Sequence, residues 1–142
     1  MRVRAVLDQN DPLCAAQLRD AVCVECDVTA DVYEEYDRLG GGRIDDPYDV
    51  ADALARADVS RLASALRNDL ERAALSLAPQ IRSGRDALGA AGALGVILAG
   101  SGPTWLGLAR DEAHAVSVAA GVQGEFARVE VAHSVDHGPR RV

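Results

Sequence analysis

The chain has 142 residues, which suits one domain and is long enough to bury a substantial core. Hydrophobic residues make up 49% of it and charged residues 26%, an ordinary globular mixture that argues against intrinsic disorder. The net charge is −7 and all 15 basic residues are arginine, which argues against a nucleic-acid surface of clustered cations and excludes any step that needs a lysine amine.

No segment has the pattern of a membrane span or a targeting signal. No apolar run approaches the roughly 20 residues that cross a bilayer. Residues 1–11 are mixed and charged, without the apolar stretch of a signal peptide. We therefore expect a cytoplasmic protein with no membrane partner.

The cysteines do not form a disulfide or metal-binding pattern. Cys14, Cys23 and Cys26 are odd in number and all lie near the N-terminus. Cys23 and Cys26 have the Cys-x-x-Cys spacing, but no second ligand pair follows them. We predict no metal site and no redox role.

The first third of the chain predicts a strand and then a helix. Residues 1–20 are not placed, although residues 13–18 are compatible with a short helix. Residues 21–27 alternate as a strand does, and Thr29 is a suitable cap for a helix over residues 30–39. Three glycines at 40–42 end that helix. We expect its buried side to carry Val32, Tyr33 and Tyr36.

Residues 46–90 predict short antiparallel helices. Asp46 followed by Pro47 is typical of a helix start, and this helix should run to about residue 57. Asp58 caps the next helix, Asn68 and Asp69 interrupt it, and residues 70–77 continue helically. A further helix begins at residue 79 and ends at the glycines at 89 and 92. The positions expected to face inward are Val50, Leu54, Ala57, Leu62, Ala65 and Leu66.

The last third predicts a hairpin, a helix and a strand. Residues 94–99 form an aliphatic run of strand length, and residues 105–109 form its pair across a glycine-rich turn. Asp111 caps a helix through Ala113, Val116 and Ala120, which Gly121 and Gly124 close, and the alternation over residues 127–131 predicts a last strand. Helices followed by a hairpin–helix–strand unit predict an α+β domain with a largely antiparallel sheet packed against helices.

The glycine-rich turn is the strongest candidate for a binding element. It consists of Gly100, Ser101, Gly102, Pro103 and Thr104, called the glycine loop below. Two glycines permit positive φ, so successive amide groups can form an anion-binding concavity, to which the two hydroxyls add. Such a loop can hold a phosphate or brace another loop that does. The dinucleotide fingerprint is excluded because a tryptophan stands where its third glycine belongs, and the Walker loop because no lysine is present.

Three segments in chain order resemble the GHMP kinase family. Residues 90–104, which end in the glycine loop, look like that family's third motif, which closes against the ATP phosphate loop of the first domain. Residues 68–71 (Asn-Asp-Leu-Glu) and residues 29–33 leading into 36–39 are similar to the family branch that acts on 4-diphosphocytidyl-2-C-methyl-D-erythritol. The similarity covers residues 27 to 142. Ala99 departs from it, because this branch often has serine there.

The resemblance implies a fold and a function. It implies a GHMP-kinase C-terminal-type, ferredoxin-like domain over residues 27–142, after an unplaced N-terminal segment over residues 1–26. It implies a complete enzyme that uses ATP and magnesium to phosphorylate 4-diphosphocytidyl-2-C-methyl-D-erythritol in isoprenoid precursor synthesis. The glycine loop would then brace the phosphate loop or lie near the substrate.

The resemblance also implies that part of the enzyme is missing. No proline-plus-glycine-serine ATP loop appears, so we expect the N-terminal ATP-binding domain to be absent. We expect this chain to be inactive alone and to bind neither ATP nor magnesium tightly, and we assign it no catalytic residue. The implied partners are the N-terminal kinase domain, a small-molecule substrate and, through an apolar patch left near the glycine loop, a second copy of the chain.

Other candidate residues have ordinary structural interpretations. The polar side chains of residues 68–71 are typical of a helix cap, and the acidic pairs at 34–35 and 45–46 of solvated faces and caps. His133 and His137 have metal-like spacing, but a glycine and a proline follow them and disfavour a helix. His114 is expected on an exposed helix face. Trp105 is better explained as core than as a platform for a base.

Two other functions stay open. The chain fits a stand-alone, non-catalytic α+β module that binds a small anion or dimerises. It also fits the C-terminal half of a different GHMP kinase, acting on a sugar, homoserine or mevalonate. Fold resemblance does not separate these, because function resides in the site.

Overall fold

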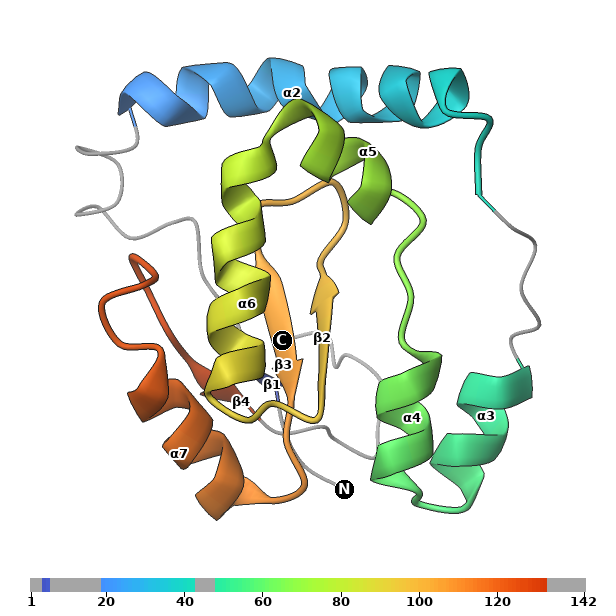
Figure 1. Cartoon of the computed structure of the whole chain (residues 1–142), viewed down its shortest axis with the longest axis vertical. Helices are drawn as coiled ribbons and strands as arrows, with labels where there is room; N and C mark the ends of the chain where they lie inside the picture. The colour runs from blue at the N-terminus through green and yellow to red at the C-terminus, as the bar shows by residue number, and fades with distance from the viewer. Residues whose placement is uncertain (1–3, 6–18, 43–47, 133–142) are drawn as a thin grey trace, which may run out of the picture.

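The computed structural model describes residues 4–5, 19–42 and 48–132 and has an α+β architecture (Figure 1). Its helices are α2 (Arg19–Arg38), α3 (Tyr48–Ala55), α4 (Val59–Ala65), α5 (Glu71–Leu77), the 3-10 turn η1 (Pro79–Ile81), α6 (Arg82–Ala90) and α7 (Glu112–Gly121). Its strands are β1 (Arg4–Ala5), β2 (Gly95–Leu98), β3 (Trp105–Leu108) and β4 (Val131–Ala132). The predicted α+β class is confirmed.

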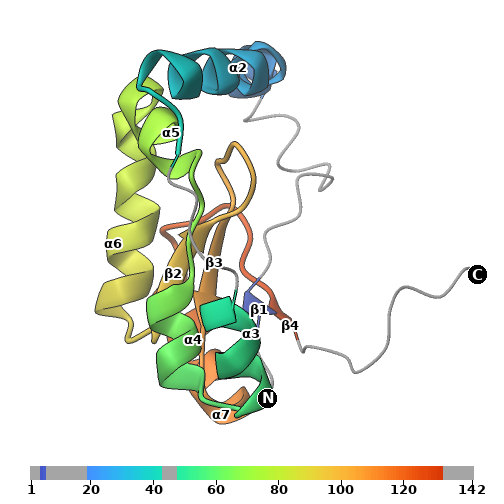
Figure 2. The same ribbon diagram turned by 90° about the vertical axis from the view of Figure 1, so that its right-hand side faces the viewer.

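Antiparallel strand pairs form the centre of the domain. β2 pairs with β3 so that Leu98 stands opposite Trp105, and β1 pairs with β4. Helix α6 packs along the β2–β3 hairpin, and Figure 2 shows it on one side of that hairpin with β1 and β4 on the other. Helix α2 crosses one end of the molecule and rests on α5. None of the helices within the described residues is long and apolar enough to cross a membrane.

Two of the predicted helix starts are present with their caps. The side chain of Asp58 accepts a hydrogen bond from the Arg61 amide at 2.9 Å at the start of α4. The side chain of Asp111 accepts one from the His114 amide at 2.8 Å at the start of α7. Each satisfies one of the amide groups that a first helical turn leaves without a partner. The cap predicted at Asp46 lies outside the described residues.

The core is built from small aliphatic residues around one indole ring. Trp105 is 2% exposed, and its Nε1 donates to the Ile81 carbonyl at 2.9 Å, so its interpretation as core is confirmed. Helix α6 approaches this ring at Gly84, where a Cβ atom would lie 2.7 Å from Trp105 Cδ1. The other buried members of the cluster are Val32, Ala73, Ala74, Leu88, Leu98, Val118 and Val122.

The prediction for the N-terminal strand is wrong. Residues 21–27 belong to α2, and Thr29 lies inside that helix and does not cap it. No glycine or proline occurs between residues 19 and 38, so nothing interrupts the helix, whereas the alternation spans only seven residues. The proposed domain boundary at residue 27 falls within α2 and stays a prediction. Residues 13–18 lie outside the described part.

Two of the predicted helix faces differ from the faces that are buried. Tyr33 is 54% exposed although Val32 is fully buried, and Leu54 is 52% exposed beside the buried Ala53. In α7 the inward positions are Ala115 and Val118, while Val116, Ala113 and Ala120 are exposed. Helices rich in alanine and valine offer two neighbouring apolar stripes, and the packing partner decides which one is buried. Ala57, also expected inward, is exposed just after α3.

The last strand is also shorter than predicted. Residues 127–130 have no regular strand structure, and β4 comprises only Val131 and Ala132. Its partner is β1, near the N-terminus, so pairing extends only as far as that short strand reaches.

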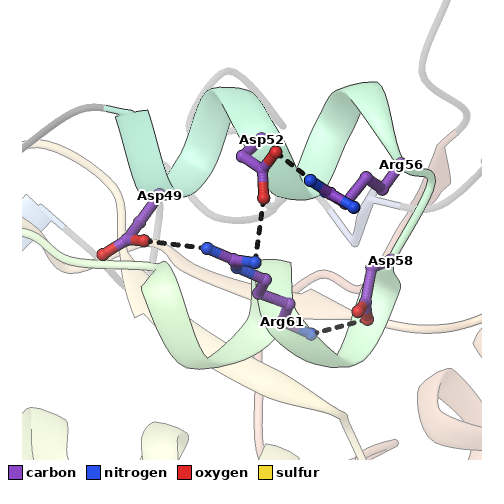
Figure 3. A network of polar contacts seen from close by, with 5 residues as sticks. All are labelled: Asp49, Asp52, Arg56, Asp58 and Arg61. Carbon is purple, nitrogen blue, oxygen red and sulfur yellow. Dashed lines mark hydrogen bonds and ion pairs between the residues drawn. The ribbon is translucent and has the colours of Figure 1, made fainter.

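An exposed ion-pair network joins α3 to α4 (Figure 3). The Arg61 guanidinium lies 2.8 Å from an oxygen of Asp52 and 3.1 Å from one of Asp49. Arg56 pairs with Asp52 at 2.8 Å, and Asp58 caps α4 beside them. Exposed pairs of this kind each contribute at most about 1 kcal/mol, so the network orients the helical hairpin more than it stabilises the domain.

Candidate functional site

The glycine loop joins β2 to β3 with the backbone geometry expected from its sequence. Gly100 has a φ of +60° and Gly102 a φ of +99°, the positive values that the two glycines permit. The Ala99 amide donates to the Thr104 carbonyl at 2.8 Å, and the Gly102 amide donates to the Ala99 carbonyl at 3.2 Å. These two bonds close the base of the loop, and Figure 1 shows that it rises toward α2 and α5.

Asn68 holds the loop from the side of α5. Its Nδ2 donates to the Leu98 carbonyl at 2.8 Å and to the Gly100 carbonyl at 2.6 Å. Its Oδ1 accepts from the Leu70 amide at 3.0 Å. The side chain therefore closes the turn before α5, whose N-cap is Leu70 without a side-chain cap bond, so the predicted helix cap at Asn68 is not formed as such. It also holds two carbonyls that lie 30 and 32 residues further along the chain, which the sequence pattern did not indicate.

Helix α2 meets the loop from another direction. The hydroxyl of Thr29 lies 3.2 Å from the hydroxyl of Ser101, and either oxygen can donate. This contact joins residues 72 positions apart in the chain. The three segments that carried the family resemblance thus meet at the glycine loop.

The donors of the loop suit an anion or a carbonyl oxygen. Within the part of the chain that the structure describes, the amides of Gly100 and Ser101 donate no backbone hydrogen bond, so both are free to donate to a neighbour. Turns with positive φ can collect such amides into an anion-binding concavity. The residues present thus fit contact with a phosphate or with another loop's backbone.

The glycine loop carries no carboxylate for magnesium. Among the described residues, no three side chains of His, Cys, Asp or Glu lie close enough together to hold a metal ion. Magnesium prefers carboxylate oxygens, and the glycine loop offers only neutral groups. No step is therefore assigned to a metal at these residues.

Glu35 departs most from the sequence-based interpretation. It was expected on a solvated face, but it is 7% exposed and contacts α5. Arg38 donates to its two oxygens at 2.5 and 2.7 Å, and the Ser76 hydroxyl donates to Oε1 at 2.7 Å. The Arg38 hydrogen bonds, followed by that from Ser76, lower the pKa of Glu35 to about 2. Arg38, three residues after Glu35, was the sequence signal for an ion pair. The burial of Glu35 depends on α5 and has no signal in the local sequence.

The remaining candidates have structural surroundings. Glu71 pairs with Arg85 at 2.8 Å. His114 is half-buried and not exposed: its Nδ1 accepts from the Arg110 amide at 3.3 Å and its Nε2 lies 3.1 Å from the Gly92 carbonyl. Cys23 and Cys26 lie in α2. The other cysteine and the histidines predicted not to bind zinc lie outside the described residues: Cys14, His133 and His137.

Comparisons with known proteins agree with this arrangement. The sequence model of the family described as "GHMP kinases C terminal" matches residues 50–128. Three similar curated proteins are each named 4-diphosphocytidyl-2-C-methyl-D-erythritol kinase. That of Gloeobacter violaceus is 52% identical over 73 residues, covering 51% of this chain and 24% of the relative.

Two actinobacterial relatives with the same name align over longer stretches. That of Streptomyces coelicolor is 48% identical over 96 residues, 64% of this chain and 32% of the relative. That of Thermobifida fusca is 41% identical over 116 residues, 78% of this chain and 36% of the relative. The chain thus matches between 24% and 36% of the length of these relatives.

Proposed function

Because the chain belongs to the GHMP kinase family, we propose that it forms the C-terminal part of a kinase that phosphorylates 4-diphosphocytidyl-2-C-methyl-D-erythritol. The complete enzyme uses ATP and magnesium and acts in isoprenoid precursor synthesis. The acceptor hydroxyl oxygen forms a bond to the γ-phosphorus and releases its proton to solvent, the bond from that phosphorus to the bridging oxygen breaks, and ADP leaves. Such transfer depends mainly on positioning and charge stabilisation.

In this proposal the glycine loop braces the ATP phosphate loop of an N-terminal kinase domain. The observation that carries it is the contact of Asn68 with the carbonyls of Leu98 and Gly100. That contact fixes the loop's carbonyls and leaves the amides of Gly100 and Ser101 for the partner loop or a phosphate oxygen. Gly100, Ser101, Gly102, Pro103 and Thr104 are positioning residues here, and none is assigned a catalytic role.

A chimera tests the substrate and the role together. The segment of the Thermobifida fusca relative that aligns with this chain is replaced by the corresponding residues of this chain. ADP release is then followed with ATP, magnesium and 4-diphosphocytidyl-2-C-methyl-D-erythritol, with homoserine, mevalonate and a sugar as competing acceptors. We expect turnover with the first acceptor only, and none from the 142-residue chain by itself.

The outcomes against the proposal are distinct. A folded chimera that prefers another acceptor would refute the proposed substrate. Turnover by the 142-residue chain alone at the rate of a relative would refute the proposal that catalysis requires an N-terminal kinase domain. Self-association of the chain is a separate prediction, which sedimentation velocity over a range of concentrations checks.

A further inference from the structure

The glycine loop has two side-chain supports, which come from different helices. Asn68 lies three residues before the start of α5 and holds the carbonyls of Leu98 and Gly100, while Thr29 in α2 meets the hydroxyl of Ser101. The distance between these supports depends on how α2 rests on α5. Any contact that fixes the two helices relative to each other therefore also fixes the position of the glycine loop.

A partly buried polar contact joins the two helices. The hydroxyl of Ser76 in α5 donates to the carboxylate of Glu35 in α2 at 2.7 Å, and two bonds from Arg38 hold the same carboxylate from within α2. Glu35 lies six residues after Thr29 in one continuous helix (29 to 35), about 9 Å along its axis. A shift of α2 at Glu35 is thus transmitted to Thr29.

A charged hydrogen bond suits this task better than apolar packing does. Val32 is fully buried between the same elements, but aliphatic contacts are non-directional and tolerate small sliding movements. A hydrogen bond to an ionised carboxylate is short and restricts both distance and angle. The hydrogen bonds from Arg38 and then from Ser76 lower the pKa of Glu35 to about 2, so the carboxylate stays ionised at neutral pH and in mild acid.

We propose that Glu35, through Ser76, is a positioning residue that sets α2 on α5 so that Thr29 meets the glycine loop. This inference rests on the proposed function only for its consequence in the kinase, because the positioning itself concerns this chain alone. Among the described residues, neither side chain hydrogen-bonds to the glycine loop, so each acts through Thr29.

A double-mutant cycle on the 142-residue chain tests the positioning. The variants are Ser76→Ala, Thr29→Val and their combination, and the reporter is hydrogen exchange of the Gly102 amide, which donates to Ala99 within the loop. Ser76→Ala should speed this exchange about fivefold, the factor that the net loss of one hydrogen bond gives. In the Thr29→Val background, Ser76→Ala should not speed the exchange further, because the contact between Thr29 and Ser101 is already lost.

Controls separate positioning from general loss of stability. Ser64→Ala removes a serine whose hydroxyl donates to a carbonyl of its own helix at 3.1 Å, and it should leave the exchange unchanged. Ser76→Thr keeps the hydroxyl and should restore the original rate. If Ser76→Ala leaves the exchange unchanged, or speeds it equally with and without Thr29, the positioning role is refuted.

The chimeric kinase tests the consequence independently. Ser76→Ala should raise KM for ATP about fivefold and leave kcat within about twofold, because the loop is displaced by the loss of about one hydrogen bond while the reacting groups are intact. Unchanged KM together with faster exchange would overturn the loop's role in the proposed function and leave the positioning in place.

Discussion

Replacing Asn68 with alanine removes a side chain that makes three hydrogen bonds. Two run to the Leu98 and Gly100 carbonyls, at the end of β2 and in the loop. The third caps the turn before α5 by accepting from the Leu70 amide. The substitution therefore loosens the glycine loop and the start of α5 together.

The expected cost follows from the surroundings of each bond. A net hydrogen bond contributes about 0.5–1.5 kcal/mol, and the upper part of that range applies where the abandoned group is shielded from water. The bond to Leu98 is partly buried, whereas the bond to Gly100 is exposed, so water can replace it. With the lost cap of the turn before α5, a further net hydrogen bond of about 1 kcal/mol, the free energy of unfolding should fall by about 2–3 kcal/mol.

Urea and thermal unfolding of the 142-residue chain measure this loss. A loss of that size should lower Tm by about 5–10 °C for a domain of this length. Asn68→Asp is the matched variant, because its carboxylate still accepts from Leu70 but offers no donor to the two carbonyls. It should recover the cap's share of the loss, about 1 kcal/mol, and no more.

Two results would refute this reasoning. An Asn68→Ala variant within about 0.5 kcal/mol of the parent would show that the three bonds are not formed in solution. An Asn68→Asp variant as stable as the parent would show that the cap alone matters and that the loop is held by other means.

Three further predictions concern other positions. Gly102→Val should lower the free energy of unfolding in urea by about 1–3 kcal/mol, because φ at Gly102 is +99°. The control Gly89→Ala, in α6 with open space around its Cβ position, should raise it by about 0.5–1 kcal/mol. Equal effects of the two substitutions would contradict the backbone argument. Gly84→Ala should cost about 1–3 kcal/mol and perturb the fluorescence of Trp105, because the new Cβ would lie 2.7 Å from its ring; an unchanged spectrum and midpoint would argue against the close approach. The pKa of Glu35 is lowered from 4.5 to about 2 on folding, so its ionised form stabilises the protein above pH 4.5, and this contribution is lost as pH falls toward 2. The Tm difference between the parent and Glu35→Gln should therefore shrink as pH falls across that window. A constant difference would refute the lowered pKa of Glu35.

The site was predicted from sequence only in part, and the reason differs by residue. The positive φ of Gly102 was predictable because it depends on the residue's own lack of a Cβ. The sequence predicted a helix cap at Asn68, and its side chain does satisfy a local amide, that of Leu70 two residues away, but in the turn before α5. Its bonds to Leu98 and Gly100 span 30 and 32 residues, and no local pattern indicates which distant carbonyl a side chain will reach.

The sequence by itself determined the features governed by neighbours along the chain. Asp58 and Asp111 cap their helices, and the aliphatic run before Gly100 pairs with the segment that begins at Trp105. Caps, turns and hairpins form within a few residues, so the local sequence is sufficient for them.

Only the tertiary structure decided which faces were buried and which distant groups met. Helix α2 replaced the predicted strand, and α7 buried Val118 while Val116 stayed exposed. Glu35 became a buried carboxylate because α5 covers it and Ser76 donates to it. Apolar burial is non-directional, so an amphipathic or alanine-rich helix acquires its buried face only from the element packed against it.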